Sequence, residues 1–368
     1  MVRKVVITII TIAIIIGAAA YAYYMMNLQP SIPELKDLVE IVKEGMYEFE
    51  GDLTFLLNVR YGGSTIIIVN ANSSNIRYGT KFSKKENYTL IYVHIPTLKT
   101  ILNVERHDFE KYKYKILIEL INSTILEEVE NTRVKICLAD EIKAKPLSEE
   151  VEELEIKFNI PDFCNVTSFE KYFRIENYGE IVKTYQKLYL DIGKKIAKVF
   201  IYDRTLSING YISYCYKYDS VVNLTKVILE NKDYIVDVIY NYTNIFMKYY
   251  QYRTTYVVPR VERSDIEKSI DELISKLRQN PDLELWNLYT YVCIEPEQKV
   301  ITKLDIKFSN VNKTRFTINF SLTFNVHKLR LNYIDEDLIS KYGNLPLRNF
   351  EEIIQPFIST YTIPTSKD

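Results

Sequence analysis

The sequence predicts an α+β protein: an N-terminal transmembrane helix followed by two tandem copies of a mostly antiparallel sheet with a packed helix. Three observations support this prediction. An uncharged run opens the chain, two segments recur in the same order along it, and long stretches alternate apolar and polar residues. We expect a cytoplasmic N-terminus at 1–4, the anchor at 5–26, copies at 27–178 and 179–345, and a tail at 346–368.

The composition is that of a folded protein with balanced charge. The chain has 368 residues, 47% of them hydrophobic, and its 47 Lys and Arg nearly equal its 48 Asp and Glu. This balance gives no electrostatic reason to bind nucleic acid, so we expect no nucleic-acid partner. Ten glycines and three histidines leave little material for phosphate-binding loops or histidine metal centres, so we expect neither a cofactor nor a metal.

The anchor is predicted from residues 5–26, none of which is charged. As a helix these 22 residues would span about 33 Å, enough for the hydrocarbon core of a bilayer. Because Arg3 and Lys4 precede the run, the positive-inside rule predicts a single-pass cell-membrane protein with its N-terminus in the cytoplasm and its C-terminal part outside. The alternative is a signal peptide cleaved near residues 18–22, which would make the protein secreted.

Two further features are typical of exported proteins. Sequons for N-glycosylation begin at Asn72, Asn87, Asn122, Asn165, Asn223, Asn241, Asn312 and Asn319. The four cysteines are even in number and suit two disulfides: Cys137, Cys164, Cys215 and Cys293. All three connectivities are possible from the sequence, and one bridge in each copy would join Cys137 to Cys164 and Cys215 to Cys293. Buried free thiols are the alternative.

The duplication is inferred from matches in the same order along the chain. VERHDFEK at 104–111 matches VERSDIEK at 261–268 in six of eight places. A proline precedes each segment, a cysteine follows each, and the pentapeptides LEIKF at 154–158 and LDIKF at 304–308 come last. No flexible linker separates the copies, so we expect two superposable modules that pack on each other.

Helices are predicted where apolar residues recur at intervals of three and four. The second-copy helix begins near Asp265 with capping-box spacing, ends before Asn280-Pro281, and has this apolar side: Ile266, Ile270, Leu273, Ile274 and Leu277. Its first-copy counterpart is expected at residues 108–121. Another helix is expected to begin at Ser31, just beyond the anchor.

Most of the remaining chain is predicted to form strands. Apolar and polar residues alternate strictly at 316–326, and the same alternation appears around Leu304, Ile306 and Phe308. Strands with one apolar side favour antiparallel sheets that bury one face. The sequence therefore predicts that a sheet forms the larger part of each copy.

No catalytic group stands out. We interpret His94, His107 and His327 as structural, because no nucleophile motif surrounds them. Two acidic pairs at predicted helix starts are candidates for a carboxylate hydrolase, but capping explains them better: Glu105 with Asp108, and Glu262 with Asp265.

The densest aromatic cluster is a candidate binding surface. It consists of Tyr240, Tyr242, Tyr249, Tyr250, Tyr252 and Tyr256. On a strand face, such tyrosines can bind sugars or another protein. Tyrosine is also an ordinary strand former, so a structural role is the alternative.

These observations together predict a non-enzymatic, membrane-anchored, glycosylated surface protein whose duplicated ectodomain binds surface or membrane proteins or the cell envelope. Two alternatives stay open. One is an extracytoplasmic hydrolase that acts on glycans or peptides through carboxylates. The other is an accessory subunit of a membrane complex, or a virion surface protein, that contacts its partners through small residues at 17–20 of the anchor.

Overall fold

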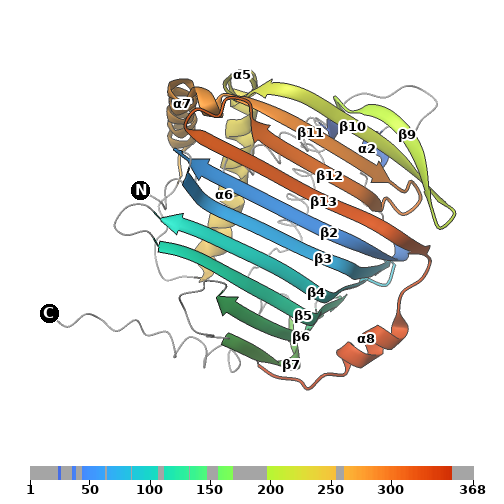
Figure 1. The fold of residues 1–368 in the computed structure, drawn as a ribbon. Helices are drawn as coiled ribbons and strands as arrows, with labels where there is room; N and C mark the ends of the chain where they lie inside the picture. The colour runs from blue at the N-terminus through green and yellow to red at the C-terminus, as the bar shows by residue number, and fades with distance from the viewer. Residues whose placement is uncertain are drawn as a thin grey trace.

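A single antiparallel sheet of eleven strands forms the body of the protein, in the order β7-β6-β5-β4-β3-β2-β13-β12-β11-β10-β9 (Figure 1). The computed structural model describes residues 24–25, 35–38, 44–62, 64–83, 85–106, 112–131, 133–146, 156–168, 197–253 and 261–349. Beside this sheet, the short strands β1 (Tyr24–Met25) and β8 (Ala197–Lys198) pair with each other.

The first half of the chain contributes six long strands and the second half contributes five. They are β2 (Glu44–Tyr61), β3 (Ser64–Ser83), β4 (Tyr88–Arg106), β5 (Tyr112–Glu130), β6 (Arg133–Pro146), β7 (Ile156–Ser168), β9 (Ile201–Ile208), β10 (Tyr211–Asn223), β11 (Leu285–Ile294), β12 (Ile301–Asn310) and β13 (Phe316–Leu331). The helices are α2 (Leu35–Leu38), α5 (Leu224–Glu230), α6 (Lys232–Arg253), α7 (Arg263–Gln279), the 3₁₀ turn η1 (Pro281–Leu283) and α8 (Glu336–Gly343).

The two halves of the chain are joined through one ladder of hydrogen bonds. Strand β13 pairs with β2 from Phe316 opposite Tyr61 to Leu331 opposite Tyr47. This pairing runs along the whole of β13, so the halves share one continuous sheet. The predicted fold class of two tandem α+β copies is therefore wrong, and the boundary at residues 178 and 179 lies outside the described residues.

The expected helix at residues 108–121 is also wrong. From Tyr112 onward this segment belongs to β5, which pairs with β4 on one side and β6 on the other. Its apolar residues Tyr114, Ile116, Ile118 and Leu120 recur every second position, the period of a strand. The similarity to the segment that forms α7 therefore does not extend past Tyr112, where this part of the chain is a strand.

The second-copy helix is confirmed as α7. It begins at Arg263 and ends at Gln279, and its buried side chains are Ile266, Ile270, Ile274 and Leu277. Glu262 and Asp265 form the capping box, and Arg263 pairs with Glu267 at 3.0 Å. The strands predicted at 316–326 and around Ile306 are confirmed as β13 and β12. Of the helix expected from Ser31, α2 is described, with Leu35 and Leu38 buried.

The membrane anchor is the next correction. Tyr24 and Met25 lie in strand β1, so the predicted helix through residues 5–26 is wrong at its C-terminal end, while residues 5–23 lie outside the described part. Within the described ranges, the structure contains no helix whose length and apolar character fit a membrane span. The single-pass topology, the signal-anchor and the cell-surface location derived from that helix are therefore withdrawn.

The main core lies between one face of the sheet and helices α5, α6 and α7, and Figure 1 shows α6 running behind the strands. Trp286 is the largest fully buried side chain, and its indole nitrogen donates to the carbonyl oxygen of Leu283 at 2.8 Å. The buried side of α7 packs into the same cluster. This end of the sheet is thus covered by protein on one face.

A line of irregularities crosses the sheet near its middle. Register shifts occur between Val326 and Lys328, between Gly51 and Leu53, and again in β5 and β6. Asn75 and Asn122 lie on this line with φ of 56° and 51°, a left-handed conformation that Asn tolerates. Bulges increase the local twist and bend a strand. Because the bulges lie side by side on neighbouring strands, these strands bend at the same place.

Candidate functional site: the apolar face of the sheet

One face of the sheet, which we call the apolar face, is defined by three rows of residues paired across the strands. The first row is Leu288, Phe308, Phe320, Leu57, Val69, Leu102 and Ile116; the second is Thr290, Ile306, Leu322, Phe55, Ala71, Thr100, Ile118 and Ala144; the third is Val292, Leu304, Phe324, Leu53, Ser73, Leu98, Leu120 and Ile142. Residues paired in this way lie on the same face.

The opposite face, which we call the polar face, has a different composition. One of its rows is Tyr291, Asp305, Thr323, Thr54, Asn72, Lys99, Glu119 and Lys143. Lys99 and Glu119 form an ion pair across β4 and β5 at 3.2 Å. Alternation thus divides the sheet into a largely aliphatic face and a face that carries most of the charged residues, together with some apolar ones such as Leu56, Ile101 and Leu117.

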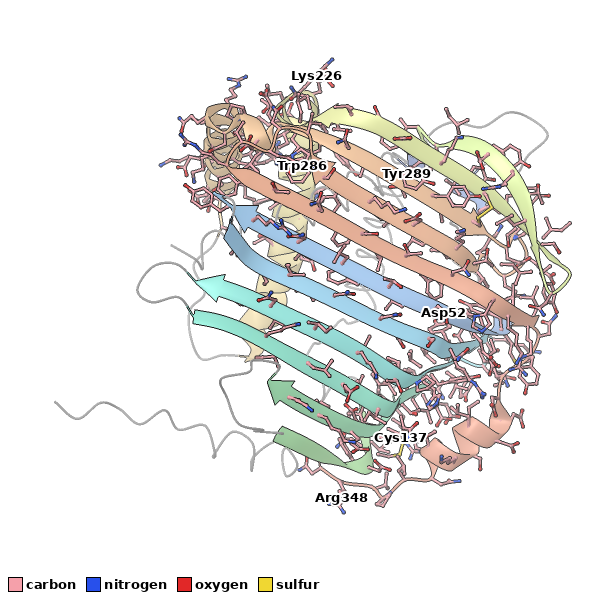
Figure 2. All side chains as sticks on the ribbon, viewed as in Figure 1. Asp52, Cys137, Lys226, Trp286, Tyr289 and Arg348 are labelled. Atoms are coloured by element: carbon pink, nitrogen blue, oxygen red, sulfur yellow. A yellow bond between two sulfur atoms is a disulfide. The ribbon has the colours of Figure 1, made fainter. Side chains whose placement is uncertain are left out.

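The apolar face is most deeply buried where the helices pack on it, and within β3–β6 Ser73 and Val134 are buried too. On β11, Leu288 and Val292 are 6% and 1% exposed beneath the helices that pack there. Further along the rows, every aliphatic side chain of β3–β6 is only half-buried. Beyond the irregularity at Asn122 the odd-numbered residues of β5 lie on this face, because Ile125 pairs through Val93 with Tyr78, which stacks on Phe49 beside Phe324. Ile125 is 48% exposed. Figure 2 labels Trp286 at the covered end.

The half-buried region covers a broad part of the sheet. Five strands about 4.8 Å apart and three rows that extend over some 20 Å give an area of roughly 500 Å². Contiguous apolar patches of that size mark contact sites for ligands or partners more often than ordinary surface. The β2–β6 part of the apolar face is therefore the candidate functional site.

Two charged side chains interrupt this region among the described side chains of β2–β6, and both are carboxylates. Asp140 accepts a hydrogen bond from the Ser123 hydroxyl. Glu127 is half-buried and is paired across the strands with Ile91 and Ile136. Within the described part of the chain, Glu127 has neither a cation nor a hydrogen-bond donor as a partner.

Two tyrosines lie on the same face near Glu127. The ring centroids of Tyr47 and Tyr78 are 6.0 Å apart, and Phe49 stacks on Tyr78 at 5.0 Å. Burial raises the pKa of Tyr78; hydrogen bonds with Thr80 and Tyr47 oppose this rise, and the negative charge of Glu127 adds to it. This end of the apolar face therefore carries the negative charge of Glu127 and two tyrosine hydroxyl groups that can form hydrogen bonds.

The polar face carries an ion-pair network that fastens helix α8. Glu48 is fully buried, contacts Arg330 and accepts a hydrogen bond from the Tyr92 hydroxyl. Tyr92 in turn accepts from the backbone N–H of Asp335, whose carboxylate caps α8 and pairs with Arg77 at 3.2 Å. Every member has a partner, so we interpret this network as structural.

The titratable groups beside this network are shifted accordingly. Burial alone would raise the pKa of Glu50, but the hydrogen bond from Lys328 and the charges of Arg77 and Arg330 outweigh it and lower the value. Burial, with the charges of Arg77 and Lys341, lowers the pKa of His94. His94 is therefore neutral near pH 7, as a structural histidine hydrogen-bonded to Thr124 at 2.8 Å.

A second group that sequence reasoning missed lies on the polar face of β9–β12. Lys303 and Arg204 lie over the ring of Tyr291, and Lys307 lies over Tyr289, which is labelled in Figure 2. The charges are balanced locally, because Asp305 pairs with Lys307 at 3.0 Å. Strand alternation predicts the shared face, but the pairing of distant strands could not be read from sequence.

The cysteines form two disulfides, Cys137–Cys164 and Cys215–Cys293, one of the three connectivities that the sequence left open. Each joins residues directly opposite on neighbouring strands, β6 with β7 and β10 with β11. Figure 2 shows Cys137 beside α8. Both bridges are structural elements of the sheet and lie outside the candidate site.

The sequon asparagines fall in varied surroundings. Asn72, Asn87, Asn122 and Asn241 are exposed, and Asn319 is half-buried on β13. Three others have amide nitrogens that donate within the chain: Asn165 to Arg348, Asn223 to Glu284, and Asn312 to Pro281.

The predicted tyrosine surface lies on helix α6 instead of on a strand. Tyr240 packs against the main core and Tyr242 is 51% exposed. The side chains of Tyr249, Tyr250 and Tyr252, and all of Tyr256, lie outside what the structure describes.

The acidic pairs and the histidines do not come together in a catalytic arrangement in the described residues. Glu262 and Asp265 cap α7, whereas the side chain of Glu105 and all of Asp108 and His107 lie outside the description. His327 Nδ1 is 3.8 Å from Asp52 Oδ2, and both side chains are exposed. Within the described ranges, no three His, Cys, Asp or Glu residues are grouped to hold a metal.

The function predicted from the sequence has to be corrected with the fold. A glycosylated, duplicated ectodomain behind a single-pass helix presupposes two modules and that helix, and the structure has one sheet spanning both halves and a strand at Tyr24–Met25. The accessory-subunit alternative depended on the anchor helix and is corrected with it. The hydrolase alternative depended on acidic pairs, and one of them, Glu262 with Asp265, caps α7. The apolar face was not among the predicted sites, although the alternation of apolar and polar residues at 53–59, 67–71, 98–104 and 116–120 indicates it.

Comparisons with known proteins add little. No family model and no curated protein matches the chain. Among solved structures, the outer membrane protein OprG from Pseudomonas aeruginosa is similar at 7% identity with a TM-score of 0.18, over 80% of this chain and 99% of that one. A likeness with so low a TM-score carries no argument about fold or function.

Proposed function

We propose that this protein is a non-enzymatic binding protein for long aliphatic chains, which it takes up on the β2–β6 part of its apolar face. The observation that carries the proposal is the half-burial of every aliphatic side chain in the three rows of β3–β6. Aliphatic ligands suit this surface because Leu, Ile and Val offer contact without polar groups that would have to be desolvated.

The proposal is tested by the binding of N-phenyl-1-naphthylamine to the purified full chain, measured by the rise of its fluorescence in apolar surroundings. Dodecanol serves as the competitor that displaces the probe. Leu102→Gln places an amide on the apolar face, whereas Ile101→Gln makes the same kind of change on the neighbouring residue, which faces the other way. Both side chains are half-buried, so the pair is matched. We expect Leu102→Gln to weaken probe binding about fivefold and Ile101→Gln to leave it unchanged.

Thermal unfolding of both variants controls for folding. The proposal is wrong if the wild-type chain does not bind the probe, if dodecanol does not displace it, or if both variants weaken binding equally. Size-exclusion chromatography adds an independent outcome. A stable dimer that excludes the probe would assign the apolar face to a second copy of the chain.

A further inference from the structure

The Glu127 carboxylate lies in an unusual place. Its neighbours on the apolar face are Ile91 and Ile136 across the strands and Ile125 and Val129 on its own strand. A carboxylate in half-buried, aliphatic surroundings is normally paired with a cation, because burial disfavours an isolated charge. The described side chains supply no such partner for Glu127.

The surroundings of Glu127 leave room for a partner from outside the chain. Ile125, two residues away on the same face, is 48% exposed, so this part of the sheet is accessible. Tyr78 lies close enough for the charge of Glu127 to affect its hydroxyl. A carboxylate next to a tyrosine hydroxyl offers acceptors to an N–H donor and no positive charge to repel it.

From this arrangement we infer that the ligand of the apolar face is a cationic amphiphile, whose ammonium head pairs with Glu127 while its aliphatic chain lies along the adjoining side chains of that face, Ile91, Val93, Ile125, Ile136 and Leu138. The inference rests on the proposed function and adds the class of head group. Charge complementarity is its basis, because both charged side chains described on this region are carboxylates, and Asp140 is already hydrogen-bonded to Ser123.

Three compounds with the same chain separate the head group from the tail: dodecylamine, dodecanol and dodecanoate, each below its critical micelle concentration at pH 7. Each displaces N-phenyl-1-naphthylamine from the full chain. We expect dodecylamine to displace the probe at about a tenfold lower concentration than dodecanoate, with dodecanol between them. Glu127→Gln removes the preference for the amine and leaves dodecanol unchanged.

Glu128 supplies the matched control, since it is the next residue of β5, points to the polar face and is 3.9 Å from Lys135. Glu128→Gln is expected to keep the preference for the amine. Glu127→Lys is expected to reverse it in favour of dodecanoate, which distinguishes charge recognition from a general loss of structure.

Equal displacement by all three compounds, or the same preference in Glu127→Gln as in wild type, would overturn this inference while leaving the proposed function in place. Failure of the probe or of dodecanol to bind would instead refute the proposed function itself. The two failures are therefore distinguishable in one experiment.

Discussion

Replacing Asp282 with Asn is expected to destabilise the protein by about 3 kcal/mol. Asp282 lies in the η1 turn, is 3% exposed and holds the loop between β12 and β13. One carboxylate oxygen accepts from the backbone N–H and the hydroxyl of Thr314 at 3.0 and 2.7 Å. The other accepts from the backbone N–H groups of Arg315 and Phe316 at 2.5 and 2.9 Å.

The magnitude follows from these contacts. An Asn side chain keeps one acceptor oxygen and turns an NH₂ group toward two backbone N–H donors, so two hydrogen bonds to a charged acceptor are lost. Each contributes about 1.5 to 3 kcal/mol, and some relaxation of the exposed loop reduces the sum. Urea unfolding at pH 7 measures the difference, with Asp219→Asn on the exposed face of β10 as a control expected within about 0.5 kcal/mol of wild type.

The same substitution predicts a change in acid stability. Burial alone would raise the pKa of Asp282, but the hydrogen bonds from Phe316, Arg315 and Thr314 outweigh it and hold the pKa well below its usual value. The stabilisation is therefore complete above the unfolded-state pKa of about 3.9 and is lost as the pH falls toward the folded-state value. Stability should fall less steeply below pH 4 in Asp282→Asn than in wild type. A loss under 1 kcal/mol at pH 7, with an unchanged acid profile, would refute this reasoning.

Two further predictions concern the sheet. Arg330→Met leaves the fully buried Glu48 without its cation, and should cost about 3 kcal/mol or more in denaturant unfolding, with partial recovery in the double variant with Glu48→Gln. Replacing Cys215 and Cys293 by Ala removes the disulfide between residues 78 positions apart, and should lower the free energy of unfolding by about 4.5 kcal/mol. The same change at Cys137 and Cys164, which are 27 positions apart, should lower it by about 3.6 kcal/mol.

Each of these predictions has an outcome that would contradict it. If Arg330→Met is no less stable than wild type, the contact between Arg330 and Glu48 does not stabilise the folded protein. If removing the disulfide Cys137–Cys164 lowers the free energy of unfolding more than removing Cys215–Cys293, chain entropy does not determine which disulfide stabilises the protein more. Non-reducing electrophoresis before unfolding establishes that the remaining bridge is intact in each variant.

Local periodicity determined much of the secondary structure. Capping-box spacing at Ser264–Glu267 and the spacing of Ile266, Ile270 and Ile274 predicted α7, although the structure forms the capping box with Glu262 and Asp265; strict alternation predicted β13. These patterns are local because hydrogen bonding and burial repeat every 3.6 residues in a helix and every two in a strand. The same rule would have predicted β5, had the alternation at 114–120 been preferred to the resemblance with residues 261–268.

The assembly of the strands was decided only by the tertiary structure. Nothing in the sequence specifies that β13 pairs with β2, because this contact joins residues more than 250 positions apart. The wrong inference of tandem modules arose at this point, since a local match carries no information about long-range pairing. Figure 1 shows the result as one sheet shared by both halves.

The candidate site depends on the same long-range pairing. Alternation in each strand marks one apolar side, but a row such as Phe320, Leu57, Val69 and Leu102 exists only when the strands are in register. Which end of that face the helices cover is also a tertiary property. The sequence by itself therefore determined that each strand has an apolar and a polar side. The tertiary structure decided that the apolar sides join into one half-buried face that includes the carboxylate of Glu127. Burial and charge pairing depend on neighbours that are distant in the chain, so no single strand could show this.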